Sequence, residues 1–109
     1  MTTALYHLAI EVEPGSEEAW NRWHEEVHVP EVLREPGFLS CEKWRDTEAA
    51  PDGWARYLCS YTMTGLDAVR AYTASDAAKR LRADSLSRFG SVTRISRQVL
   101  TGMKRFGAP

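Results

Sequence analysis

Apolar and polar residues alternate along this chain with two different periods, and the changes between them predict six elements. Four stretches follow the two-residue alternation, or the apolar and aromatic enrichment, of a β-strand. These predicted strands cover residues 5–12, 38–45, 54–63 and 91–106. The second and third are joined by a polar connection, 46–53, with Pro-Asp-Gly turn chemistry, so they are expected to form a hairpin. The last is expected to place alternate residues on one partly covered face, namely Thr93, Ile95, Arg97, Val99, Thr101 and Met103.

The first helical stretch follows the Pro14-Gly15 turn, and Ser16 is the expected N-cap. Trp20, Trp23, Val27 and Glu31 recur at steps of three and four residues, so they are expected to form one stripe facing the core. The helix is expected to end at Gly37. Because Pro30 lacks a backbone donor and disfavours helix at the residue before it, a kink or break is predicted just after His28.

The second helical stretch covers 66–89 and is predicted to break near Thr73, where Ser75-Asp76 offers a new cap. Its apolar residues at helical spacing are Leu66, Val69, Tyr72, Ala77, Leu81 and Phe89. The resulting order is strand, helix, strand, strand, helix, strand. This order predicts an α+β, ferredoxin-like βαββαβ domain over residues 1–109, with a four-stranded antiparallel sheet and two helices on one face.

A sheet covered on one face leaves its second face without a partner. Pairing two such sheets across a twofold axis would bury both open faces, so a homodimer forming an α/β barrel is expected. Sedimentation as a monomer at micromolar concentration would contradict this expectation.

Composition narrows the functional classes. The 14 basic and 15 acidic residues nearly cancel and the basic ones are scattered, which argues against nucleic-acid binding. The sequence has no basic leader before an apolar run and no bilayer-length apolar stretch, so a soluble cytoplasmic protein without membrane contact is expected. Cys41 and Cys59 are expected to be reduced and, if the hairpin has no bulge, nearly opposite each other.

Two histidines one helical turn apart are the main candidates for chemistry. His24 lies within the apolar stripe and His28 at its edge, where an imidazole can exchange a proton near neutral pH. Glu31, three residues further, could hold the ring of His28 and fix its tautomer. A purely structural histidine at the edge of the core is an equally open interpretation of His28.

Residues 24–28 also match the H-E-x-x-H pattern, in which two histidines bind zinc and the glutamate activates water. A catalytic zinc needs a third protein ligand, and His7 on the first strand is the remaining histidine. No downstream metalloprotease signature follows the pattern. We therefore expect no metal and no other cofactor, and we keep a zinc hydrolase as a minor alternative.

Aromatic residues could line a ligand pocket near these histidines. Trp20 and Trp23 share their helix, and Tyr57 and Tyr61 share one face of the third strand. With His7, these four are the candidate substrate-binding residues, although simple packing is the favoured interpretation of the tyrosines and tryptophans.

Several segments resemble the dimeric α/β-barrel superfamily: the Trp-rich first helix with EVHVPEVLREPGF, the ARYLCSY strand and RLRADSLSRFG. The chain is most similar to small bacterial domains of unknown function with a His-x-Pro-Glu-Val-Leu stretch, and more distantly to EthD-like proteins. The resemblance covers nearly the whole chain. It implies a ligand between sheet and helices, with His28 matching the recurrent histidine; members of the superfamily include cofactor-free monooxygenases, isomerases, cyclases and haem enzymes.

These observations favour a small cofactor-independent enzyme that acts on an apolar or aromatic oxygenated metabolite. Histidine acid–base chemistry suits an isomerase, cyclase or lyase. A cofactor-free monooxygenase is one alternative. A non-catalytic accessory protein that binds a small molecule is another.

Overall fold

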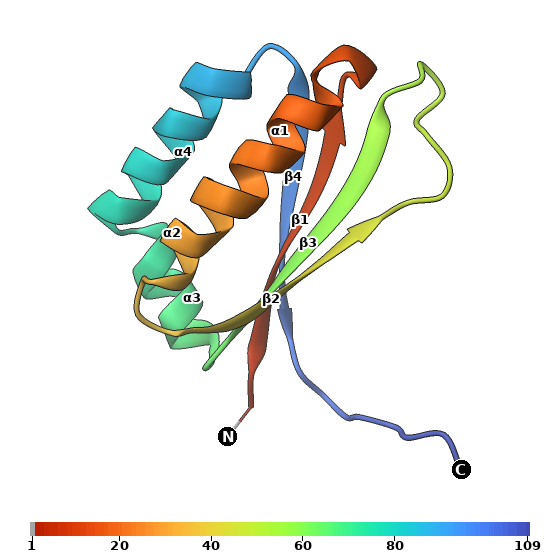
Figure 1. Ribbon diagram of the computed structural model, residues 1–109. Helices are drawn as coiled ribbons and strands as arrows, with labels where there is room; N and C mark the ends of the chain where they lie inside the picture. The colour runs from red at the N-terminus through yellow and green to blue at the C-terminus, as the bar shows by residue number, and fades with distance from the viewer. Residues whose placement is uncertain (1) are drawn as a thin grey trace.

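The computed structural model describes residues 2–109. A four-stranded antiparallel sheet, in the order β2-β3-β1-β4, carries all the helices on one face (Figure 1). The elements are β1 (Ala4–Val12), a 3-10 turn (Pro14–Ser16), α1 (Glu17–Trp23), the π-helical turn η2 (His24–His28), α2 (Val29–Leu33), β2 (Phe38–Arg45), β3 (Ala55–Met63), α3 (Leu66–Thr73), α4 (Asp76–Phe89) and β4 (Thr93–Thr101). The predicted ferredoxin-like fold is confirmed.

The core lies between the sheet and the helices because the two central strands alternate strictly. In β1, every second residue from Ala4 to Val12 is buried, and β3 follows the same alternation from Ala55 to Met63. The intervening residues of β1, such as His7, face the opposite side of the sheet. We call that side the open sheet face, since no helix covers it in the described part of the chain (Figure 1).

The first helix continues past Pro30, where the sequence predicted a kink or break. The chain instead widens into η2, whose backbone bonds span five residues; the N–H of Val29 reaches the carbonyl of His24. Pro30 has no N–H and its ring would clash with the carbonyl four residues earlier, so a wider turn just before it relieves both problems. The extra residue rotates Val27 outward, and its side chain is 38% exposed instead of lying in the core stripe.

The second helical stretch breaks at Ala74, as predicted near Thr73, and Ser75 caps α4 by accepting a hydrogen bond from the N–H of Ala78. The buried alanine of α4 is Ala78, whereas the sequence pattern placed Ala77 in the stripe. The new cap resets the helical phase, so spacing counted across the break is off by one residue.

The hairpin and the last strand also differ in detail from expectation. A β-bulge between Phe38 and Ser40 shifts the register by one residue, and Cys41 pairs with Tyr61 instead of lying opposite Cys59. Strand β4 ends at Thr101, and the residues beyond it lie outside the sheet (Figure 1). Met103, predicted on the covered face of β4, is 92% exposed. None of the described helices combines the length and apolarity needed to span a bilayer.

Candidate functional site

His24 and His28 lie together on the inner side of the continuous helix formed by α1, η2 and α2, which we call the histidine helix. Their ring centroids are 5.7 Å apart. Each imidazole stacks on the tryptophan that precedes it by one helical turn. His24 stacks on Trp20 with 4.4 Å between ring centroids, and His28 stacks on Trp23 with 4.8 Å. The stack fixes both rings against the sheet, as a rigid site requires.

Both histidines border a hollow between the sheet and the helices, which we call the inner cavity. Its volume is about 40 Å³. Tyr6, Cys59 and Tyr61 line it from the sheet, Trp20 and Trp23 from the histidine helix, and Tyr72 from α3. Since about 10–15 Å³ suffices for one water molecule, this space by itself holds a few waters and no aromatic ring.

Burial keeps both imidazoles neutral. It lowers the pKa of His24 to about 3, with smaller contributions from the positive charge of Lys43 and from His28. Burial also lowers the pKa of His28; the charges of Glu31 and Asp84 oppose this, and that of Arg97 adds to it. At neutral pH both rings are therefore unprotonated, and the same burial makes each a weaker base than a solvent-exposed histidine.

In the part of the chain that the structure describes, two buried polar atoms of cavity-lining residues lack a hydrogen-bond partner: Trp23 Nε1 and His24 Nδ1. The two residues are only 7% and 3% exposed, respectively. A buried polar atom without a partner costs about 1–3 kcal/mol.

Two of the phenols that line the cavity, those of Tyr61 and Tyr72, remain protonated. Burial raises the pKa of Tyr61, and burial together with the nearby Tyr6 raises that of Tyr72 to about 12, against opposing charges from Arg82 and Arg97. Protonated phenols can donate hydrogen bonds to a carbonyl or enolate oxygen.

The structure separates three of the candidate residues from the inner cavity. His7 lies on the open sheet face, where its Nδ1 is 2.7 Å from Ser60 Oγ. Tyr57 donates to Glu17 and accepts from Asn21, away from the cavity. Glu31 acts on His28 through its charge but forms no hydrogen bond with it among the described residues. The residues brought together are thus Trp20, Trp23, His24, His28 and Tyr61.

The two thiols are close although their residues are diagonal neighbours on the paired strands. Their sulfurs are 3.4 Å apart and both cysteines are free. The contact with Cys41, together with burial, raises the pKa of Cys59, while the same contact lowers that of Cys41. Cys59 Sγ also lies 3.9 Å from His24 Nε2, so one nitrogen of that ring faces a protonated thiol.

A zinc site of the H-E-x-x-H type finds little support in this arrangement. The sheet separates His7 from His24 and His28. Within residues 2–109, no group of three or more His, Cys, Asp or Glu side chains is placed to hold a metal ion.

Sequence reasoning missed several cavity residues, namely Tyr6, Cys59, Tyr72, Arg82 and Arg97. Strand alternation could have found three of them. Tyr6 and Cys59 have the phase of the buried residues of β1 and β3, and Arg97 shares a face of β4 with the partly buried Ile95. Arg82 follows the buried Leu81 on α4, and no pattern in the sequence separates it from the other arginines of that helix.

The comparisons with known proteins agree on the fold. A family model for a domain of unknown function, DUF4286, matches residues 3–103. An EthD-family protein of Bacillus halodurans C-125 superposes with a TM-score of 0.68 at 17% identity, covering 96% of this chain and 100% of its own. SnoaB of Streptomyces nogalater, described as a cofactor-independent oxygenase, gives 0.68 at 16% identity, with 99% and 100% covered.

HapK of Hahella chejuensis gives a TM-score of 0.66 at 16% identity, with 100% of this chain and 97% of that chain covered. A comparison with curated proteins found no significant match. Identities this low establish a shared fold and not a shared reaction.

Proposed function

The chain belongs to the DUF4286 domain family, and from that premise we propose that it is a small cofactor-independent enzyme using His28 as a proton-transfer base. Its ligand is an apolar or aromatic oxygenated metabolite that reaches the inner cavity. The observation that carries the proposal is the neutral imidazole of His28, stacked on Trp23 at 4.8 Å and bordering the inner cavity between the sheet and the helices.

The proposed step is the removal of a proton from a carbon or oxygen next to a ligand carbonyl. A general base must be unprotonated at working pH, and burial keeps His28 neutral, although the lowered pKa also weakens it as a base. The phenols of Tyr61 and Tyr72 support the proposal as donors to the oxygen on which negative charge develops. Return of the proton to a different atom completes an isomerisation.

The proton-transfer role is tested with His28→Gln, which keeps a polar side chain but loses the base. The assay follows deuterium uptake from D₂O, by NMR, next to the carbonyl of small aromatic ketones such as 2-tetralone. The wild type is expected to exceed buffer, and the variant to lose about 100-fold or more of that rate, in line with general-base contributions. His7→Gln is the matched control, because His7 lies on the open sheet face. Unchanged exchange in His28→Gln would remove the catalytic role.

A cofactor-free oxygenase is the second candidate, and it is favoured by the structural likeness to SnoaB. Proton removal by His28 would give a carbanion able to react with molecular oxygen. An oxygen electrode distinguishes the two candidates: consumption that depends on both protein and ligand indicates an oxygenase, and deuterium uptake without consumption indicates simple proton transfer.

The hypothesis of a non-catalytic binding protein predicts different results in these assays. The imidazole of His28 would then only fix a polar group of the ligand, so His28→Gln would bind the ligand more weakly, and neither protein would exchange protons or consume oxygen. The reduced thiols Cys41 and Cys59 suit a cytoplasmic location for either activity.

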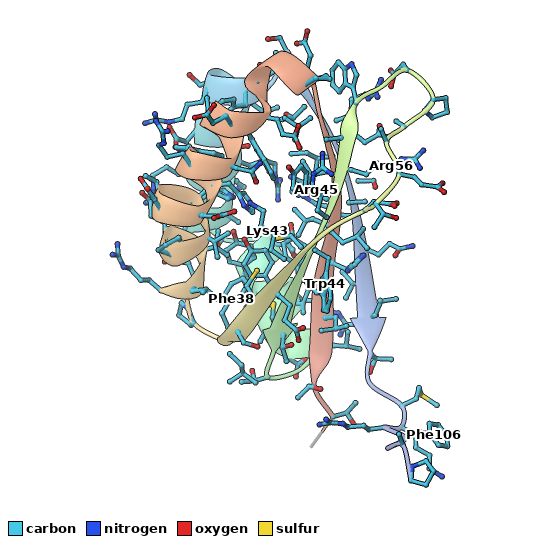
Figure 2. The ribbon with its side chains drawn as sticks, turned by 45° about the vertical axis from the view of Figure 1, so that its right-hand side comes forward. Phe38, Lys43, Trp44, Arg45, Arg56 and Phe106 are labelled. Atoms are coloured by element: carbon cyan, nitrogen blue, oxygen red, sulfur yellow. The ribbon has the colours of Figure 1, made fainter. Side chains whose placement is uncertain are left out.

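We also propose a homodimer formed through the open sheet face. Trp44 pairs with Leu58 and Leu58 with Ala9, which places these apolar side chains in one row across that face. Figure 2 shows Trp44 on the opposite side of β2 from Lys43, whose Nζ bonds to Asn21 and Glu25 on the histidine helix. Trp44 is 59% exposed. An apolar row in a strongly exposed position is typical of a contact surface.

A further inference from the structure

A second hollow lies directly outside the inner cavity, between α4 and β4. This outer hollow has a volume of about 170 Å³ and is lined by Arg82, Ser85, Leu86, Thr93, Ile95 and Arg97. Arg82, Ser85, Ile95 and Arg97 also line the inner cavity. The shared residues make the two spaces neighbours, so a ligand too large for the inner cavity can extend into the outer one.

The two arginines at this junction are not used by the fold as ion-pair partners. Among residues 2–109 neither Arg82 nor Arg97 forms a salt bridge, whereas Arg88 on the same helix is paired with Asp84. Arg97 Nε donates to Tyr6 Oη at 3.1 Å, which holds its side chain on the cavity side of β4. Arg82 and Arg97 both act on Tyr72 through their charges, so they converge on one region.

Acidic groups near the junction do not neutralise the pair. Asp84 is held by Arg88 at 3.0 Å. Glu31 acts on His28 and Glu35 on Tyr72, in each case as a minor cause beside burial. Two guanidinium groups therefore remain with free donors at the mouth of a cavity that is otherwise aromatic.

We propose that the ligand is an organic carboxylate whose anionic group lies between Arg82 and Arg97, an inference that rests on the proposed function. Planar guanidinium groups bind planar carboxylates through paired hydrogen bonds. The apolar body occupies the outer hollow against Leu86 and Ile95, and a small oxygen-bearing part reaches the inner cavity. There it meets His28 and gives Trp23 Nε1 or His24 Nδ1 a partner.

The test compares two probes of the same shape and different charge, 2-naphthoate and 2-naphthamide, by isothermal titration at low salt. The wild type is expected to bind the carboxylate about tenfold more tightly than the amide, as is typical for one charged hydrogen-bonded pair. In Arg82→Gln/Arg97→Gln this preference is expected to vanish. Added salt should weaken binding of the carboxylate and leave the amide unchanged.

The matched control is Arg70→Gln/Arg80→Gln, which removes the same charge from residues that do not line either hollow. It should keep the tenfold preference. Loss of the Arg97 bond to Tyr6 could prevent the double variant from folding. In that case Arg82→Gln alone tests the proposal, since Arg82 has no hydrogen-bond partner among the described side chains. This single variant should lose at least half of the carboxylate-over-amide preference, measured as the logarithm of the affinity ratio.

Each contrary result has a separate meaning. Equal affinity of the wild type for both probes, or a preference that survives in the double variant, overturns the carboxylate inference and leaves the proposed cavity standing. Tighter binding of 2-naphthyl phosphate than of the carboxylate overturns the ligand class. If the wild type binds none of the probes at millimolar concentration, the proposed function falls together with the inference.

Discussion

His24 is a polar side chain held in the core, and its burial has a cost that depends on pH. The ring stacks on Trp20 and faces the thiol of Cys59, and its pKa is lowered to about 3 chiefly by burial. The unfolded chain would protonate this ring near its ordinary pKa of about 6.5. Between these two values the unfolded state binds more protons, so stability rises with pH and is lost as the pH falls below about 6.5.

We therefore expect the free energy of unfolding to fall from pH 6.5 to pH 5, with His24 contributing about 1 kcal/mol per pH unit. Urea denaturation at several pH values measures this slope. His24→Gln removes the titrating ring and should flatten the slope by that amount, while His7→Gln, whose ring lies outside the core, should keep it. An equally steep slope in His24→Gln would show that other groups cause the dependence.

At this scale the sequence predicted which residue types matter but not where each side chain points. The tryptophan and histidine pairs were recognised from helical spacing, and five of the eight candidate residues line the inner cavity. Tyr57 shares the phase of Tyr61 on β3, yet it lies at the far end of the strand, where Glu17 and Asn21 take its hydroxyl. Alternation fixes the face of a strand and not the distance along it.

Among the elements, η2 is the one that the sequence did not predict. Pro30 signalled an irregularity, and the position of that signal was accurate to one turn. Whether a helix bends, stops or widens depends on its packing, however, and here Trp20, Trp23 and Val32 hold the helix on the sheet on both sides of the irregularity. With both flanks fixed, one extra residue in a wider turn is the available adjustment.

Deleting Val27 should convert η2 into a regular turn while both flanking segments keep their core contacts, because a π-helical turn contains one residue more than an α-helical turn. We expect this variant to fold with a free energy of unfolding within about 1 kcal/mol of the wild type, near the median effect of a single mutation. It should keep the proton-transfer activity, since His28 then follows Trp23 by four residues of regular helix and stays on the face that borders the inner cavity.

The control is deletion of Ala83, an exposed residue in the regular helix α4. That deletion rotates the following residues by about a quarter turn and displaces Phe89 from the core, so a loss of several kcal/mol is expected. Urea denaturation and circular dichroism measure both variants. Similar destabilisation by the two deletions would contradict the special tolerance of η2.

For the whole molecule, the sheet order was predictable because the six elements follow a known connection pattern, and the structure has that order. The oligomeric assembly is harder to predict, because the sequence of one chain indicates an exposed apolar row but not the surface that covers it. On the open sheet face the row of Trp44 and Leu58 lies beside a charged row containing Glu11, Arg56 and Arg94. Figure 2 labels Trp44 and Arg56 on this side of the molecule.

We expect Trp44→Glu to sediment as a monomer at concentrations near 10 µM, where the wild type sediments as a dimer, because a buried unpaired carboxylate is strongly unfavourable at an interface. Analytical ultracentrifugation measures the change. Leu86→Glu, an exposed position on the opposite side of the sheet, is the control and should remain dimeric. A monomeric wild type, or a dimeric Trp44→Glu, would place the contact elsewhere or remove it.

The wide turn of the histidine helix has a consequence for reading related sequences. A relative with one residue fewer between the positions of Trp23 and Pro30 could form the same sheet and the same core with a regular helix, and its histidine, four residues after the tryptophan, would lie on the same face. An alignment of such a relative needs a single gap inside this helix, and only an alignment that allows the gap would match the two histidines.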